Sequence, residues 1–80
     1  MEKGKSQYVD QELLLLIGEN LKRVRKSKGL SQRKLAWDCN TDESTIRRIE
    51  QGKLNTTVSS LKRIADALEI PIEEFFKASS

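Results

Sequence analysis

Apolar residues recur at spacings of three and four through most of this 80-residue chain, which is the pattern of helices that bury one face. The first such stripe lies in the N-terminal third and consists of Leu14, Ile17, Leu21 and Val24. Asp10, before the stripe, is suited to cap the first turn of a helix, and Gly29, after it, is suited to end one. The pattern therefore predicts one long helix between these two residues.

Two more helices are predicted towards the C-terminus. Thr57 is placed to cap a helix whose apolar stripe is Val58, Leu61, Ile64, Ala65 and Leu68. Pro71 suits the opening of a last short helix that ends near Phe76, in which Phe75 fills the core position.

Residues 31–41 predict a short helix followed by a tight turn. Ser31 is a good N-cap, because its hydroxyl can accept from an otherwise unpaired amide of the first turn. The apolar face of this helix consists of Leu35, Ala36 and Cys39. Asn40 tolerates a left-handed backbone, so the helix can end there and the chain can turn.

A second short helix is predicted directly after that turn. Asp42 caps it, Ile46 and Ile49 form its inward face, and Gly52 ends it. Short apolar faces on both sides of the turn force the two helices to pack at a steep angle, which predicts a helix-turn-helix unit. No stretch alternates apolar and polar residues for long enough to predict a strand. The expected fold class is therefore all-α, with five helices.

The pattern S-Q-x-x-L-A at residues 31–36, followed by I-x-x-I-E-x-G at 46–52, resembles the lambda-repressor-like family of DNA-binding domains, also known as Cro-type or XRE. Residues 17–25 resemble the family's first helix, and residues 61–68 and 73–76 resemble its last two. Two departures are Asn40, where the family usually has glycine, and the acidic start of the recognition helix at Asp42 and Glu43. The resemblance implies a prokaryotic transcriptional regulator, a repressor or autoregulator, that binds a pseudo-palindromic double-stranded DNA operator as a homodimer.

The recognition helix carries the candidate base contacts. The resemblance assigns base reading to Asp42, Glu43, Ser44, Arg47 and Arg48. The arginine fork matches the O6 and N7 acceptors of guanine. Glu43 is suited either to accept from a cytosine amino group or to pair with Arg47 one turn along the helix. The alternative interpretation of the two arginines is a solvated helix face with ordinary charge pairing.

Four residues beside the recognition helix are candidates for phosphate contacts, namely Gln32, Arg33, Lys53 and Asn55. Gln32 and Arg33 open the helix at 32–39, and the resemblance implies that Gln32 bonds a backbone phosphate there. Lys53 and Asn55 lie in the loop after the recognition helix. Such contacts set register and affinity but carry no sequence information.

Arg25 and Glu50 are candidates for a structural ion pair. Arg25 lies four residues after Leu21, at the border of the first apolar stripe, where an unpaired cation is costly. Glu50 follows the inward-facing Ile49. The family pairs these two positions across the helices, and the resemblance implies the same bond here.

Positive charge is concentrated on the helix-turn-helix unit and its approach. Residues 21–53 contain ten Lys and Arg against four Asp and Glu, a net charge of +6, whereas the whole chain has +3. A surface that faces phosphates requires such an excess. The run Lys22, Arg23, Lys26 and Lys28 is equally typical of the solvated side of a helix.

Composition disfavours catalysis and metal or cofactor binding. The chain has no histidine, a single cysteine on an apolar helix face, and no acidic or cysteine cluster with metal-ligand spacing. The S-x-x-K string at 31–34 is explained by the helix cap. No segment resembles a signal peptide or a membrane span, so a cytoplasmic location is expected.

The chain has more apolar residues than the core-facing positions of its predicted helices can bury. The residues in excess are Leu13, Leu15, Leu16, Leu54, Ile72 and Phe76. Either they are partly buried on a small domain, or some form a dimer interface, for which Leu54, Ile72 and Phe76 are the candidates. Trp37, on the outer side of its helix, would pack over a neighbouring helix or a partner subunit.

The expected organisation is a flexible arm over residues 1–9 and one helix-turn-helix DNA-binding domain over residues 10–77. A rival interpretation uses the same fold as an antitoxin-like or other protein-interaction module. The candidate protein partners are a polymerase, for the regulator, or a toxin, for the rival module. That interpretation expects a long disordered extension or an apolar outer face on the recognition helix, and the sequence shows neither.

Overall fold

The computed structural model describes residues 9–78, and its elements are all helical. In chain order they are α1 (Gln11–Ser27), α2 (Gln32–Asp38), α3 (Glu43–Glu50), α4 (Val58–Leu68) and the 3-10 helix η1 (Ile72–Phe76). The all-α class is confirmed, since no strand occurs in residues 9–78. The count of five helices is not confirmed, because only four are α-helices. The predicted arm at residues 1–9 lies outside the described residues except for Val9.

The last element is a 3-10 helix rather than an α-helix, and the extended residues at its two ends confine it to Ile72–Phe76. The Glu74 N–H donates to the Pro71 carbonyl at 3.1 Å, an i to i+3 bond that is typical of a 3-10 turn. Pro71 and Lys77, at its two ends, both have extended backbones. Phe75 is fully buried, as predicted for the core position of this segment.

Each α-helix begins after the polar residue predicted to cap it. The caps are Asp10, Ser31, Asp42 and Thr57. Their side-chain oxygens accept from the backbone N–H three residues further on, at 2.8 to 3.1 Å. The predicted left-handed residues after the first three helices also have positive φ angles, namely Gly29, Asn40 and Gly52. These local signals fix the ends of α1, α2 and α3.

The end of α4 was not predicted, because its left-handed residue is Glu69, with φ of 59°. Glutamate rarely adopts this conformation, so the sequence carries no signal for it. The Ile70 N–H closes the end by donating to the Ala65 carbonyl at 3.0 Å.

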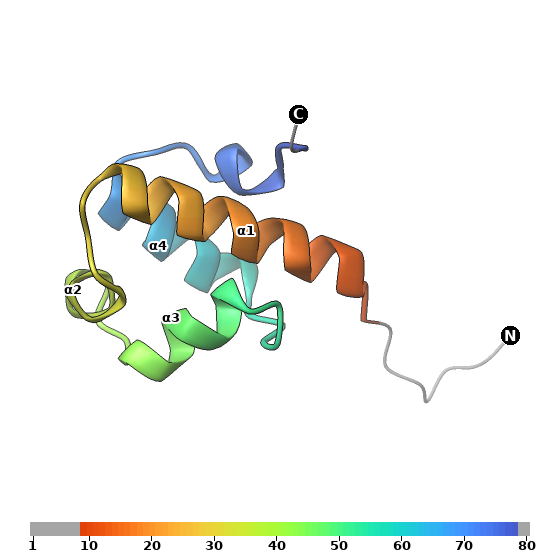
Figure 1. The fold of residues 1–80 in the computed structure, drawn as a ribbon, viewed down its shortest axis with the longest axis horizontal. Coiled ribbons are helices and arrows are strands. Elements are labelled where there is room, and N and C mark those ends of the chain that lie inside the picture. The colour runs from red at the N-terminus through yellow and green to blue at the C-terminus, as the bar shows by residue number, and fades with distance from the viewer. Residues whose placement is uncertain (1–8, 79–80) are drawn as a thin grey trace, which may run out of the picture.

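One hydrophobic core receives side chains from every element. α1 runs across the molecule, with α3 on one side and η1 on the other, while α2 packs on α3 and α4 (Figure 1). The buried apolar residues are Ile17, Leu21, Val24, Leu35, Ala36, Cys39, Ile46, Ile49, Leu61, Ile64, Ala65, Leu68 and Phe75. The predicted stripes are thereby confirmed, except that Leu14 is only partly buried and Val58 is 72% exposed. Val58 is the first residue of α4 and precedes the turn that reaches the core at Leu61.

α1 and α3 approach each other closely at Gly18. A Cβ atom at this position would lie 2.4 Å from the Ile49 carbonyl oxygen and 2.7 Å from that of Glu50. Only glycine fits such an approach of one backbone to another. This contact sets the C-terminal end of α3 against α1.

None of the helices between residues 9 and 78 is long and apolar enough to cross a membrane.

Candidate nucleic-acid interface

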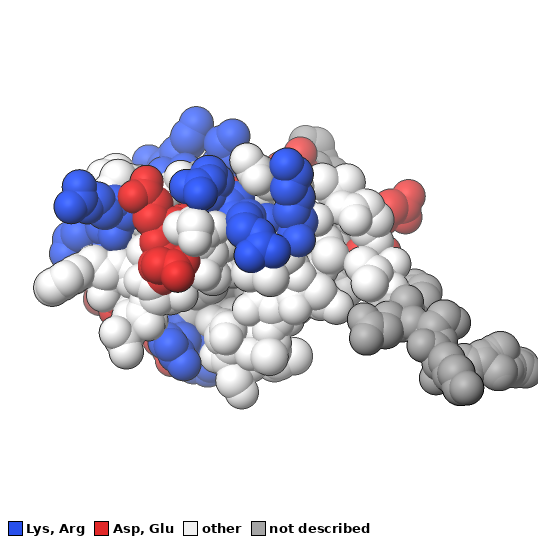
Figure 2. Space-filling model, turned by 90° about the horizontal axis from the view of Figure 1, so that it is seen from below, with Lys and Arg blue, Asp and Glu red and all other residues white. Residues whose placement is uncertain are grey.

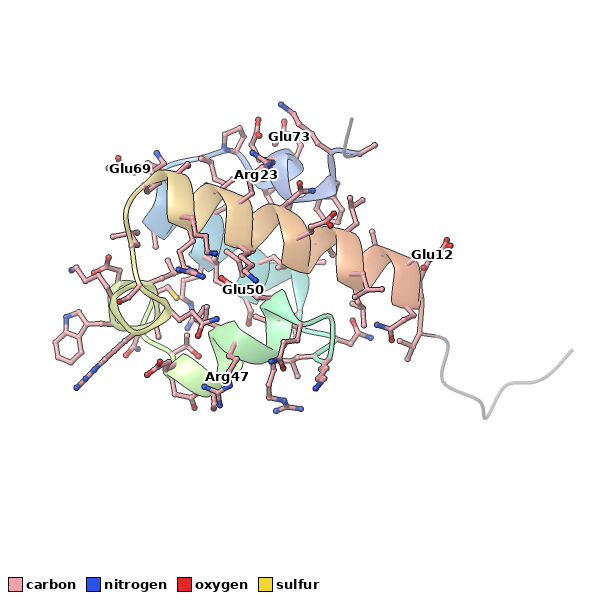
Figure 3. All side chains as sticks on the ribbon, viewed as in Figure 1. Glu12, Arg23, Arg47, Glu50, Glu69 and Glu73 are labelled. Atoms are coloured by element: carbon pink, nitrogen blue, oxygen red, sulfur yellow. The ribbon has the colours of Figure 1, made fainter. Side chains whose placement is uncertain are left out.

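α3 presents a polar face to solvent because two isoleucines anchor its other side. Ile46 and Ile49 are buried, with 0% and 2% of their surface exposed. The outward residues are those predicted, namely Glu43, Ser44, Arg47 and Arg48, all of them exposed. Arg47 projects from α3 away from the fold, whereas Glu50 lies on the side that faces α1 (Figure 3).

Among the described residues, the guanidinium groups of Arg47 and Arg48 form no ion pair with a carboxylate. The ion pairs within residues 9–78 involve other residues, so the pair between Glu43 and Arg47 that the sequence left open is not formed. Both arginines therefore retain their hydrogen-bond donors for an external acceptor.

Asp42 and Ser44 differ from the other outward residues because their side chains are used in capping. The Asp42 Oδ1 accepts from the Thr45 N–H at 2.8 Å and from the Ser44 hydroxyl at 2.9 Å. Hydrogen bonds from the side chain and backbone of Thr45, and from Ser44, hold the pKa of Asp42 below its usual value. At the start of α3, Glu43 is thus the acidic side chain that remains free to accept from a ligand.

The residues predicted to contact phosphates lie on both sides of this face. Arg33 of α2 and both Lys53 and Asn55 of the following loop are exposed. Viewed from the side on which α3 lies, Lys and Arg side chains gather mainly in the upper half of the view, with a few acidic groups among them (Figure 2). Gln32 is half-buried, and its Nε2 donates to Glu50 Oε1 at 2.9 Å.

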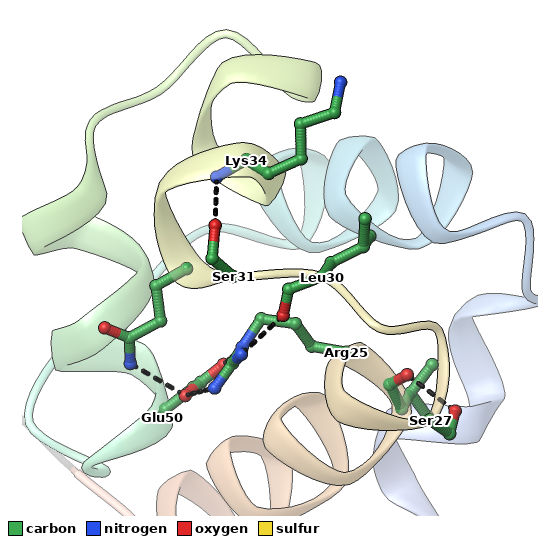
Figure 4. A network of polar contacts seen from close by, with 8 residues as sticks. Arg25, Ser27, Leu30, Ser31, Lys34 and Glu50 are labelled. Carbon is green, nitrogen blue, oxygen red and sulfur yellow. Dashed lines mark hydrogen bonds and ion pairs between the residues drawn. The ribbon is translucent and has the colours of Figure 1, made fainter.

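Arg25 and Glu50 form a buried ion pair behind this surface. The Arg25 Nε donates to Glu50 Oε2 at 2.6 Å, and Nη2 donates to Oε1 at 3.0 Å. Arg25 Nη1 also donates to the Leu30 carbonyl at 2.7 Å (Figure 4). The two side chains are only 8% and 3% exposed. The hydrogen bonds to Glu50 raise the pKa of Arg25 against the opposing effect of burial, and the network ties α1 and α3 to the segment before α2.

The candidate dimer residues do not all lie together. Leu54 and Phe76 line the same cavity, of about 150 Å³, together with Leu13 and Val58. Ile72 is partly buried against the core and is not among the lining residues. Leu13, Val58 and Phe76 are 37%, 72% and 42% exposed, so this apolar surface is open to solvent.

Trp37 is 81% exposed, so the alternative in which it packs over a neighbouring helix of the chain is wrong. Cys39 is buried, as its apolar face predicted, and burial raises the pKa of its thiol. Within residues 9–78, no group of three or more Cys, Asp and Glu is placed to hold a metal ion.

Sequence reasoning missed several polar contacts between distant segments, including those made by Gln32 and Asn20. Gln32 bonds Glu50, and the Asn20 amide donates to the carbonyl oxygens of Phe75 and Lys77 at 2.8 and 2.9 Å. Asn20 is a polar residue outside the apolar stripe of α1, so the sequence gives no reason to expect it to be buried. It is only 4% exposed because η1 docks on α1. The helical periodicity of the chain carries no signal for the contacts of Gln32 and Asn20.

Comparison with known proteins places this architecture in a family. The helix-turn-helix family HTH_3 matches residues 21–75, which is more than half of the chain. The chain belongs to the HTH_3 family. The resemblance to XRE-type domains is thereby confirmed.

Its relatives include controller proteins and transcriptional regulators. Control protein C.BamHI from Bacillus amyloliquefaciens is 35% identical over 57 residues, which cover 70% of each chain. The HTH-type transcriptional regulator PuuR from Escherichia coli is 34% identical over 59 residues, which are 74% of this chain but only 32% of PuuR. The crystal structure of the restriction-modification controller protein C.AhdI from Aeromonas hydrophila matches with a TM-score of 0.81 and 32% identity, covering 86% of this chain and all of that one.

Proposed function

We propose that this chain is a sequence-specific double-stranded DNA-binding transcriptional regulator that represses as a homodimer on a pseudo-palindromic operator. The observation that carries the proposal is the face of α3, where buried isoleucines turn outward two arginines that form no ion pair within residues 9–78. The names of relatives such as PuuR and C.BamHI support the regulatory role. The polar character of the same face disfavours an antitoxin-like module, which would present an apolar surface there.

In this proposal α3 lies in the major groove and reads bases through its free side chains. Arg47 and Arg48 donate to guanine O6 and N7, and Glu43 accepts from a cytosine amino group. Asp42 and Ser44 lie at the same end of α3, but their capping bonds reduce what they offer to a base. Arg33, Lys53 and Asn55, together with Gln32, contact phosphates and hold α3 in register.

The homodimer follows from the small number of bases that one recognition helix reads. Two copies related by a two-fold axis read two half-sites about 34 Å apart, one turn of the duplex. The open apolar surface around Leu54 and Phe76 adjoins the loop after α3, and we assign it to the contact between the two copies. A dimer on its operator, in the cytoplasm of a prokaryotic cell, represses by occupying DNA that polymerase needs.

The test is selection of duplexes from a random library, followed by affinity measurements at two salt concentrations. Arg47→Ala is expected to reduce discrimination between selected and random duplexes by about 1–3 kcal/mol. Arg33→Ala should weaken binding to both alike and lower the salt slope by about 0.9. Lys62→Ala is the matched control, because Lys62 is exposed on α4 and paired with Asp66. Equal affinity of the wild type for selected and random duplexes would refute the proposal.

A further inference from the structure

The side chain of Gln32 is held by the buried ion pair described above. Its Nε2 donates to Glu50 Oε1 at 2.9 Å, and the same oxygen accepts from Arg25 Nη2 at 3.0 Å. The other Glu50 oxygen accepts from Arg25 Nε. Gln32 is the first residue of α2, 18 positions before Glu50 in sequence. Three helices thus meet in one chain of hydrogen bonds that runs from α1 through α3 to α2.

This chain of bonds determines which end of the Gln32 amide faces inward. An ionised carboxylate only accepts hydrogen bonds, so the amide nitrogen, not its oxygen, must point to Glu50. One N–H of that nitrogen is used by Glu50, and one remains. Because Gln32 is half-buried rather than enclosed, the remaining N–H can reach an acceptor outside the protein.

The charge of Glu50 does not oppose an approaching anion, because Arg25 neutralises it. The ion pair is bidentate, and both side chains are less than a tenth exposed. The Gln32 amide is therefore fixed by a carboxylate whose charge is compensated within the protein. A glutamine already held in one rotamer loses less conformational entropy on binding than a free one.

We propose that Glu50 is a positioning residue for DNA binding, which holds the Gln32 amide so that its second N–H donates to a backbone phosphate. Arg25 acts indirectly, since it fixes the Glu50 carboxylate, which in turn fixes the Gln32 amide. The inference rests on the proposed function, and it assigns Glu50 a role in affinity besides its role in stability.

The first test is a double-mutant cycle on the duplex selected from the random library, at a temperature where circular dichroism shows every variant folded. Gln32→Ala should lower affinity about tenfold, the size of one hydrogen bond to a charged group. In an Arg25→Met, Glu50→Leu background the same substitution should cost less than about twofold, because leucine offers no oxygen to hold the amide. Arg33→Ala, which removes a neighbouring contact outside the network, should cost the same in both backgrounds. An equal cost of Gln32→Ala in the wild-type and the Arg25→Met, Glu50→Leu backgrounds overturns the inference.

The second test uses the wild-type protein and does not depend on the folding of a variant. In a ¹H–¹⁵N spectrum, the two side-chain amide protons of Gln32 are identified by their loss in Gln32→Ala. One proton should be protected from exchange without DNA and unchanged on adding the duplex, while the other shifts. The exposed Gln51 provides the reference for an unheld amide. If both Gln32 protons behave like those of Gln51, the inference is wrong. Absence of duplex binding by the wild type would instead refute the proposed function itself.

Discussion

Replacing Glu50 by alanine tests the energetic importance of the buried ion pair. The substitution removes both oxygens that accept from Arg25 and the acceptor of Gln32. Arg25 then keeps only the Leu30 carbonyl as a partner, although its side chain is 8% exposed. A guanidinium cannot lose its charge at accessible pH, so a buried cation is left without compensation.

The expected loss is large compared with the stability of a domain of this size. Removing one member of a buried ion pair costs about 3–5 kcal/mol. A chain of 80 residues lies near the lower end of the range of about 5–15 kcal/mol that single domains have. Since each kcal/mol shifts the melting temperature of a small domain by about 4–8 °C, Glu50→Ala should melt at least about 12 °C lower than the wild type.

Thermal and urea unfolding followed by circular dichroism measure this loss. Glu43→Ala is the matched control, because Glu43 is an exposed glutamate of the same helix, and its effect should stay within about 0.5 kcal/mol. Replacing both partners, as Arg25→Met with Glu50→Leu, should recover much of the stability, because no unpaired charge remains. Equal melting temperatures for Glu50→Ala and Glu43→Ala would show that the pair contributes nothing, and the reasoning would fail.

Two other predictions concern the ends of α3. Gly18→Ala should cost about 1–3 kcal/mol in urea unfolding, because its Cβ would lie 2.4 Å from the Ile49 carbonyl oxygen; a midpoint equal to that of the exposed variant Lys22→Ala would contradict the close approach of α1. Asp42 has a lowered pKa in the folded state, so its stabilisation is present above the unfolded pKa of about 4 and is lost as the pH falls through the folded value. Asp42→Asn, which still caps the helix but does not titrate, should lose less stability than the wild type between pH 5 and about pH 2, and parallel pH profiles would contradict this reading.

Much of the local structure was accessible from the sequence because its signals act over a few residues. Ser31 caps α2 through a bond to an amide three positions away, and Asn40 turns the chain through its own backbone preference. The spacing of Ile46 and Ile49 alone orients the face of α3. Where such signals were weak, prediction failed, as at Glu69, whose left-handed backbone its residue type does not favour.

Contacts between distant segments were accessible only in part. The Arg25–Glu50 pair was implied by family resemblance, and no periodicity in the chain encodes it. The bond from Gln32 to Glu50 was not foreseen at all, since it depends on the angle at which α2 meets α3. The exposure of Trp37 likewise depends on where the neighbouring helices lie, which the sequence does not specify.

The sequence by itself determined the resemblance to the family, the starts of α1 to α4 and the side of α3 that faces solvent, because helix caps, helix periodicity and burial of isoleucine are short-range effects. The tertiary structure decided which polar groups are used within the protein and which remain free. Within residues 9–78 it commits Asp42 and Gln32 to hydrogen-bond partners, forms no ion pair at Arg47 or Arg48, and places Leu54 and Phe76 in the lining of one cavity. These outcomes depend on distances between helices, which are set by the packing of the whole core rather than by any local pattern.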